Sequence, residues 1–295
     1  MRIMLTGANG QVGWELARSL MPLGEVFPLS RKQCDLSHPE TIPGIIQEIK
    51  PDIIVNAAAY TAVDKAEEEE VLATIVNGTA VGVLAEGAKK QNALLIHYST
   101  DYVFDGRKSI PYIEDDMPNP INAYGRSKLA GEEAVQQVGG NHLIFRTSWV
   151  YASRGVNFAK TMLRLVSERD EIRVVDDQIG APTSAELIAD VTALVLYRIN
   201  TDPIQAKQTG GIFHLTASGK TSWHGYAQLV LETAIKNGHN LRILPDQVIP
   251  ITTADYPLPA RRPANSCMET SKLRSTFGLI QSPWQLHVER AVLEI

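Results

Sequence analysis

Short apolar runs alternate with longer segments of helical periodicity through the first half of the chain. In "QVGWELARSL" apolar residues recur every fourth position, and "NGTAVGVLAEGAKKQN" keeps a similar apolar stripe, so both segments predict amphipathic helices. Five runs rich in β-branched and other apolar residues predict strands, at Arg2–Leu5, Glu25–Leu29, Asp52–Asn56, Leu94–Tyr98 and His142–Arg146. This alternation predicts a parallel sheet that helices cover on both faces.

Beyond residue 150 the predicted elements become shorter, and "APT", "PLPARRP" and "SPW" form loops between them. This change in pattern predicts a second, smaller lobe built on the carboxyl edge of the sheet. The four consecutive acids Glu67–Glu70 are interpreted as the solvated first turn of a helix, where acidic side chains suit the helix dipole.

Composition narrows the classes of partner. A chain of 295 residues with 44% hydrophobic and 21% charged residues can bury one large core and part of a second. Its net charge of -5 argues against nucleic acid as a partner. Cys34 and Cys267 lie far apart and in no CxxC pattern, so the sequence indicates neither a disulfide framework nor a zinc site. The sequence contains neither a leader pattern nor an apolar run of the ~18 residues that a membrane span needs, so we expect a cytoplasmic protein.

Three glycines follow the first predicted strand and open the first predicted helix. Gly7, Gly10 and Gly13 in "TGANGQVG" stand where a dinucleotide-binding turn needs them, for a tight turn, for backbone approach to a diphosphate and for close packing of helix on strand. Their spacing is GxxGxxG, one residue longer than the commoner GxGxxG motif. A purely structural glycine-rich turn is the alternative.

The end of the second predicted strand bears on cofactor choice. An NAD site usually has an acid there for the ribose 2'-hydroxyl, whereas this chain has "LSRKQ". Ser30 and Arg31 suit a 2'-phosphate, which favours NADPH and leaves NADH possible. The alternative is that Arg31 is an ordinary surface cation.

The motif and the strand pattern together predict an α/β fold, a Rossmann-type doubly wound parallel sheet with a smaller C-terminal substrate-binding lobe. Residues 1–148 would form the dinucleotide-binding domain, with 174–200 returning to it. Residues 149–173 and 201–295 would form the lobe.

Tyr124 and Lys128 in "YGRSK" lie one helical turn apart, next to the predicted helix "LAGEEAVQQV". For a tyrosine to exchange a proton at neutral pH its pKa must fall by about three, which corresponds to roughly 4 kcal/mol. A unit charge about 4 Å away supplies on the order of 4 kcal/mol at an effective dielectric constant near 20. We therefore predict that Lys128 lowers the pKa of Tyr124 for acid–base work on a carbonyl or alcohol oxygen. An exposed helical pair would be the alternative for an isolated motif.

Thr100 lies at the carboxyl end of the strand in "IHYSTDYVFDG", where its hydroxyl can bond the same substrate oxygen as Tyr124. Arg261 and Arg262 lie in the proline-rich loop "PLPARRPANS". Because guanidinium groups bind phosphate in a bidentate manner, we expect one of these arginines to bind a substrate diphosphate and the other to pair with an acid of the main domain. The alternative is that both are structural.

With these motifs in place, the sequence resembles the extended short-chain dehydrogenase/reductases and, within them, the family of dTDP-4-dehydrorhamnose reductases. The shared stretches, in order, include "GANGQVGWEL", "PDIIVNAAAYTAVDKAE", "HYSTDYVFDG", "YGRSKLAGE", "IFRTSWVY", "NFAKTML", "DQIGAPT" and "PARRPANS". The resemblance implies that NADPH or NADH gives a hydride to C4 of dTDP-4-dehydro-L-rhamnose, which makes dTDP-L-rhamnose for cell-surface polysaccharide.

The resemblance also implies roles for individual residues. Tyr124 would protonate the C4 oxygen, Lys128 would hold the nicotinamide ribose, and Thr100 would tune the hydrogen bond. The cofactor would further contact Gly10, Gln11 and Val12 at its pyrophosphate, Asp35 and Leu36 at its adenine, Ala59, Tyr60 and Thr61 along its trough, and Tyr98 at its nicotinamide ribose. The sugar nucleotide would lie against Trp149, Thr100 and Asp101.

Some members of the family have a magnesium-linked dimer contact through acids, which would fall here on Glu15 and Glu186. Surface acids on two helices are the alternative, and a homodimer is possible either way.

Two rival functions follow from the same resemblance. Sugar-nucleotide dehydratases follow the threonine with Asp-Glu, whereas here Asp101 and Tyr102 follow it, so the base for dehydration or epimerisation is missing. The chain also resembles, more weakly, the regulatory subunit of methionine adenosyltransferase, and that reading predicts a partner enzyme.

Overall fold

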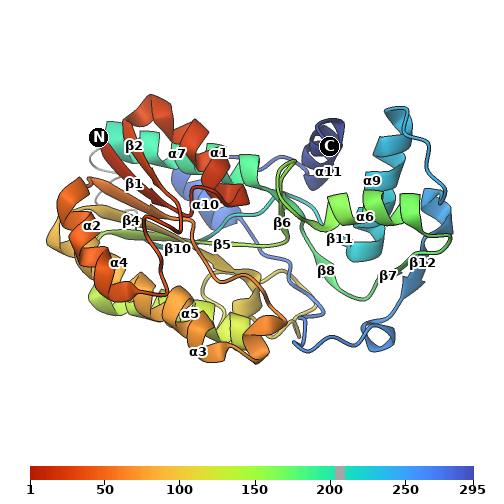
Figure 1. The fold of residues 1–295 in the computed structure, drawn as a ribbon, viewed down its shortest axis with the longest axis horizontal. Helices are drawn as coiled ribbons and strands as arrows, with labels where there is room; N and C mark the ends of the chain where they lie inside the picture. Colours follow the sequence, from red (N-terminus) through yellow and green to blue (C-terminus); the bar gives the residue numbers. More distant parts are fainter. Residues whose placement is uncertain (203–209) are drawn as a thin grey trace.

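A six-stranded parallel sheet forms the centre of the larger lobe in the structure, a computed structural model that describes residues 1–202 and 210–295 (Figure 1). The strand order is β10-β5-β4-β3-β1-β2. The strands are β1 (Arg2–Thr6), β2 (Glu25–Leu29), β3 (Ile53–Asn56), β4 (Leu94–Thr100), β5 (His142–Thr147) and β10 (Gly211–His214). The predicted fold class is confirmed, and the first five strands match the predicted runs.

Helices cover both faces of the sheet, as the alternating pattern predicts (Figure 1). The larger lobe contains α1 (Gln11–Leu20), α2 (Ile42–Ile49), α3 (Glu70–Thr74), α4 (Ala80–Lys90), α5 (Ala123–Val138), α7 (Ala185–Thr201) and α10 (Ser271–Phe277). The remaining helices are α6 (Phe158–Glu168), α9 (Trp223–Lys236) and α11 (Trp284–Leu293).

Alternate residues of the strands enter two separate cores. In β1, Ile3 and Leu5 pack in the core that contains α1 and α7, whereas Met4 packs in the core of α2 and α4. All three side chains are fully buried. Since neighbouring residues of a strand point to opposite faces, a sheet covered on both sides needs continuous apolar runs, which is why these strands could be recognised in the sequence.

The second lobe is built around three pairs of short strands and the helices α6 and α9 (Figure 1). The pairs join β6 (Val150–Tyr151) to β9 (Thr183–Ser184), β7 (Arg173–Val175) to β12 (Ile249–Ile251), and β8 (Ile179–Gly180) to β11 (Thr221–Ser222).

The predicted lobe boundaries differ from the structure at two places. Residues 211–214, assigned to the substrate-binding lobe, form β10 of the main sheet, where Phe213 is buried beside Phe145 of β5. Residues 174–184, assigned to the main domain, contribute β7 and β8 to the second lobe instead. Of the residues 174–200 that were expected to return, those of α7 do so, and this helix packs along α1.

Residues Glu70–Lys90 form one helical run, in which a π-helical turn at Ile75–Thr79 joins α3 to α4. By length and composition this run could cross a membrane, although the sequence pattern indicated no apolar stretch of that length. Val81 and Leu84 on this run are fully buried against the sheet and α2, so it is a core helix of the larger lobe.

Candidate active site

A cavity of about 1130 Å³ opens at the carboxyl ends of β1, β3 and β4, facing the second lobe. Open parallel sheets bind their ligands at this edge. The predicted site residues that line it are Gly7, Gly10, Gln11, Val12, Arg31, Asp35, Leu36, Ala59, Tyr60, Thr61, Tyr98, Thr100, Asp101, Tyr124, Lys128 and Trp149. Within the described residues, Gly13, Ser30, Arg261, Arg262, Glu15 and Glu186 do not line this cavity.

The glycine turn forms one wall of the cavity. Gly7 has φ +70°, and a Cβ there would lie 2.6 Å from the Ala58 nitrogen. A Cβ on Gly13 would lie 2.1 Å from the Gly7 carbonyl oxygen, so Gly13 serves the close packing of α1 on β1. The first turn of α1 has no acidic residue, which leaves its positive end free for an anion. These residues fit the diphosphate of a dinucleotide.

The end of β2 presents one cation to the same cavity. Arg31 is exposed, and its Nε lies 3.1 Å from Oδ2 of Asp35, one turn away in sequence. Ser30 instead donates its hydroxyl to Oε1 of Gln33 at 2.8 Å, so only Arg31 of the predicted pair faces the cavity. A 2'-phosphate would therefore meet an arginine that already has a carboxylate neighbour.

Tyr124 lies in the first turn of α5, whose start is held by two side chains. Asn122 caps the helix by accepting the Gly125 N–H at 2.7 Å. Glu67 accepts the Ala123 N–H at 2.8 Å, so this acid supports the site and is not simply a solvated surface residue. The sequence pattern predicted helix here but no role for Glu67.

Lys128 is buried one turn further along α5. Its Nζ donates to the Tyr98 carbonyl oxygen at 2.6 Å and lies 3.4 Å from Nε2 of His97. Burial lowers the pKa of Lys128 to about 8, and the charge of Glu132 opposes this change. The Tyr98 hydroxyl lies 2.8 Å from Oγ1 of Thr192 on α7, so the ribose contact predicted for Tyr98 stays a prediction.

The predicted lowering of the Tyr124 pKa by Lys128 is wrong for this structure. Burial raises the pKa of Tyr124, the charge of Asp101 raises it further, and only a hydrogen bond with Thr100 opposes them. The sequence argument assumed that the Lys128 ammonium lies about 4 Å from the Tyr124 hydroxyl. In the structure the ammonium donates to the Tyr98 carbonyl, and burial decides the pKa of Tyr124. Tyr124 is a protonated phenol at neutral pH.

Thr100 and Asp101 lie beside Tyr124 at the end of β4. The Thr100 hydroxyl donates to Oδ1 of Asp101 at 2.9 Å and accepts the Tyr102 N–H at 3.2 Å. Burial raises the pKa of Asp101 to about 7, although hydrogen bonds from Thr100 and Ser266 oppose the change. The Tyr102 ring stands edge-on to Tyr124 at a centroid distance of 5.7 Å. The hydroxyls of Thr100, Tyr102 and Tyr124 therefore lie together at this end of the cavity, beside the carboxyl of Asp101.

The two arginines of the proline-rich loop have different surroundings. Arg262 makes a bidentate pair with Asp64, with Nη1–Oδ1 and Nη2–Oδ2 both at 2.7 Å. This contact joins the loop to the segment after β3 and matches the predicted pairing with an acid of the main domain. Arg261 is exposed and its carbonyl accepts from Asn122. Diphosphate binding by Arg261 stays a prediction.

The structure adds a tryptophan pair that the sequence did not indicate. Trp149 stacks on Trp223 of α9 with centroids 3.6 Å apart, and both rings line the cavity. Trp149 has φ +47°, a strained conformation for a bulky residue, which occurs mainly where a side chain must be held for function. Trp223 lies 74 positions further along the chain than Trp149, so no local pattern could have indicated their contact.

The predicted magnesium ligands lie on the packed helices α1 and α7. Oε2 of Glu15 accepts from Arg18 at 3.2 Å, and Oε2 of Glu186 lies 3.5 Å from Arg290. Across residues 1–202 and 210–295 there is no group of three or more metal-ligating side chains. A magnesium site shared between two copies of the chain stays a prediction.

A buried ion pair fixes α5 on the sheet. Arg146 of β5 donates to both carboxylate oxygens of Glu132, at 2.9 and 2.6 Å, and both side chains are almost fully buried. Glu132 follows Lys128 by one helical turn. The pair therefore holds the part of α5 that carries the catalytic residues.

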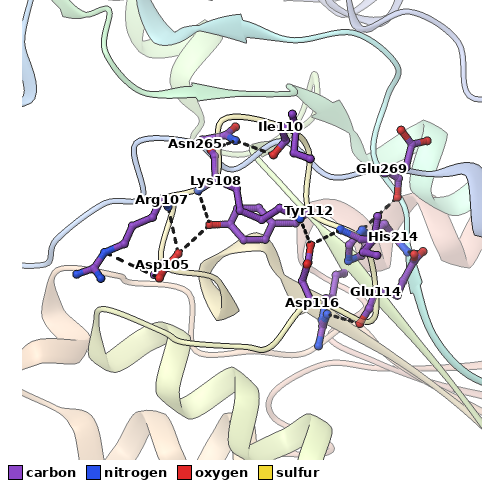
Figure 2. A network of polar contacts seen from close by, with 12 residues as sticks. Asp105, Arg107, Lys108, Ile110, Tyr112, Glu114, Asp116, His214, Asn265 and Glu269 are labelled. Atoms are coloured by element: carbon purple, nitrogen blue, oxygen red, sulfur yellow. Dashed lines mark hydrogen bonds and ion pairs between the residues drawn. The ribbon is translucent and has the colours of Figure 1, made fainter.

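Figure 2 shows the polar contacts that hold loop 105–119, which follows Thr100–Tyr102. The Tyr112 hydroxyl donates to Asp105 at 2.8 Å, and Glu114 accepts the His214 N–H of β10 at 2.8 Å. Asn265 donates to the Lys108 carbonyl at 2.7 Å. The loop is thereby tied both to the main sheet and to the chain that follows Arg262.

The fold, the glycine turn and the Thr100, Tyr124 and Lys128 group together define an NAD(P)H-dependent oxidoreductase. The chain belongs to the RmlD substrate binding domain family, whose sequence model matches residues 1–295.

Its relatives are similar over their full length. The chain is 51% identical to a dTDP-4-dehydrorhamnose reductase of Burkholderia thailandensis, covering 100% of this chain and 99% of the relative. It is 49% identical to that of Escherichia coli K12, covering 100% and 98%. The crystal structure of dTDP-4-dehydrorhamnose reductase from Bacillus anthracis in complex with NADP superimposes with a TM-score of 0.88 at 35% identity, covering 100% and 99%.

Proposed function

We propose that this protein reduces the C4 keto group of dTDP-4-dehydro-L-rhamnose to give dTDP-L-rhamnose, with NADPH as the preferred reductant and NADH as an alternative. The observation that carries the proposal is that one cavity joins the glycine turn of β1 and α1 to Thr100, Tyr124 and Lys128, in a chain of this family. We infer that the protein is cytoplasmic.

The chain's own residues would handle the proton. The nicotinamide cofactor, when bound, supplies the hydride that reaches C4. Tyr124 holds the proton for the C4 oxygen, and its raised pKa keeps it protonated at neutral pH. Thr100 orients the same oxygen by hydrogen bonding. Lys128, one turn away on α5, donates one N–H to the Tyr98 carbonyl and binds the nicotinamide ribose with its other N–H groups.

Dehydration or epimerisation is the nearest rival chemistry. Elimination of water needs a base that removes a ring proton, and the sugar-nucleotide dehydratases place that base at the second position after the threonine. Tyr102 occupies that position, and burial raises its pKa, so it stays protonated and cannot act as the base. Simple hydride transfer is therefore favoured.

A non-catalytic regulatory subunit is the rival of another class, and a cofactor site alone would suit it. Steady-state assays of the purified protein separate these functions. We expect oxidation of NADPH with dTDP-4-dehydro-L-rhamnose, slower oxidation of NADH, and weaker activity with a UDP-linked 4-keto sugar. Tight binding of NADPH without turnover of any of these sugars would support the regulatory subunit and contradict the proposal.

A further inference from the structure

Arg154 is a cation of the cavity that the proposed chemistry does not use. It lies between β6 and α6, in the second lobe, and lines the cavity together with Gly10 and Gln11 of the glycine turn. Its guanidinium stacks on the indole of Trp14, a residue of α1, at 3.6 Å from the ring centroid. The side chain therefore crosses from one lobe to the other beside the turn that fits a diphosphate.

The other cations of the cavity are already engaged. Arg31 pairs with Asp35 at 3.1 Å, and Lys65 pairs with Glu69 at 2.7 Å. Lys128 is buried on a backbone carbonyl. Arg154 has no carboxylate within ion-pair distance among the residues that the structure describes. Stacking on Trp14 holds its planar face and leaves its N–H groups free for an anion.

The loop that carries Arg154 is also tied to the glycine turn. Nδ2 of Asn157 donates to the Ala152 carbonyl at 2.6 Å and to Oε1 of Gln11 at 3.3 Å. Gly155, with φ +78°, turns the chain there, and a Cβ on it would lie 3.4 Å from the Gln11 side chain. Asn157 and Gly155, which flank Arg154 in this loop, therefore both contact Gln11 and fix the loop against the glycine turn.

We propose that Arg154 binds the diphosphate of the dinucleotide cofactor, so that the second lobe supplies a ligand to a cofactor held mainly by the first. The proposal rests on the proposed function for the identity of the cofactor. The sugar nucleotide also carries a diphosphate, but Arg154 stands beside Gly10 and Gln11, on the cofactor's side of the cavity. A guanidinium there donates charge-assisted hydrogen bonds to the diphosphate, in addition to those that the N–H groups of α1 donate.

The test measures binding to the full-length protein by isothermal titration calorimetry, without turnover, using NADPH and dTDP as separate probes. We expect Arg154→Ala to raise the Kd for NADPH by about tenfold or more and to leave the Kd for dTDP within about twofold. Arg154→Lys should recover part of the loss. The difference between wild type and Arg154→Ala should shrink as sodium chloride is raised, because salt screens an exposed charge. Arg169→Ala, an exposed arginine at the end of α6, is the matched control.

Several outcomes would overturn the proposal. Wild-type affinity of Arg154→Ala for NADPH would exclude the contact. A loss confined to dTDP would assign Arg154 to the substrate diphosphate, and a loss equal to that of Arg169→Ala would reduce it to a general effect of charge. If the wild-type protein itself bound no NADPH, the proposed function would fail before the role of Arg154 was tested.

Discussion

Replacing Lys128 by methionine should stabilise the folded protein while it removes activity. The ammonium is buried, and its pKa falls from 10.5 to about 8. Since one pH unit corresponds to about 1.4 kcal/mol, burying this charge costs the folded state about 3 kcal/mol at neutral pH. Methionine has a side chain of similar length but cannot donate the hydrogen bond to the Tyr98 carbonyl. The loss of this hydrogen bond lowers the free energy of unfolding by about 1 kcal/mol. The expected net gain is about 2 kcal/mol at pH 7.

The pH dependence has a definite sign. Because the folded-state pKa lies below the unfolded-state pKa, the unfolded wild-type protein binds more protons between pH 8 and pH 10.5. The stability of the wild type should therefore rise with pH in that window relative to Lys128→Met. The advantage of the variant should be full below pH 8 and absent near pH 10.5.

Urea unfolding followed by far-ultraviolet circular dichroism at pH 7, 9 and 10.5 measures this difference. Lys90→Met, an exposed lysine at the end of α4, serves as the control and should change stability by less than about 0.5 kcal/mol at each pH. A Lys128→Met protein that is less stable than the wild type at pH 7, or a difference that does not vary with pH, would refute the reasoning.

Three further predictions concern the site. Tyr124→Phe should lower kcat by about 100-fold or more while calorimetry finds NADPH binding unchanged, and unaltered turnover would exclude Tyr124 as the proton donor. Arg31→Ala should raise KM for NADPH by roughly ten- to a hundredfold and spare NADH in steady-state kinetics, whereas equal effects would mean that Arg31 does not contact the 2'-phosphate. Arg262→Ala should lower Tm by a few degrees, because it removes the ion pair with Asp64. Arg261→Ala should raise KM for the sugar nucleotide at least tenfold and leave Tm unchanged. If Arg261→Ala lowered Tm and Arg262→Ala raised KM, the two arginines would have each other's role.

Local patterns were enough to predict most of the larger lobe. The buried strands of a parallel sheet are continuous apolar runs, and the glycine turn has its own spacing, so β1 to β5 and the turn at Gly7 could be recognised directly. The sixth strand was missed because β10 is only four residues long and its partner β5 lies about 70 positions earlier. Short strands that pair with distant ones have little local signal.

The errors within the site have a similar origin. Sequence spacing placed Tyr124 and Lys128 on one face of α5, but it could not indicate that the Tyr98 carbonyl would take the ammonium. The Tyr124 pKa is therefore raised by burial and is not lowered by Lys128 as the sequence analysis predicted. The Arg262–Asp64 pair joins residues 198 positions apart, so only the general expectation of an acidic partner was possible.

Deuterium transfer tests the central proposal most directly. The purified protein would be incubated in D₂O with NADPH and dTDP-4-dehydro-L-rhamnose, and in H₂O with NADPH deuterated at the transferable position, with the substrate alone in D₂O as the control for spontaneous exchange. Direct reduction predicts by NMR that the product carries deuterium at C4 only from the labelled NADPH, with none from solvent at C3 or C5. Solvent deuterium at C3 or C5 above the control, or no deuterium at C4 from the labelled cofactor, would contradict direct hydride transfer to C4.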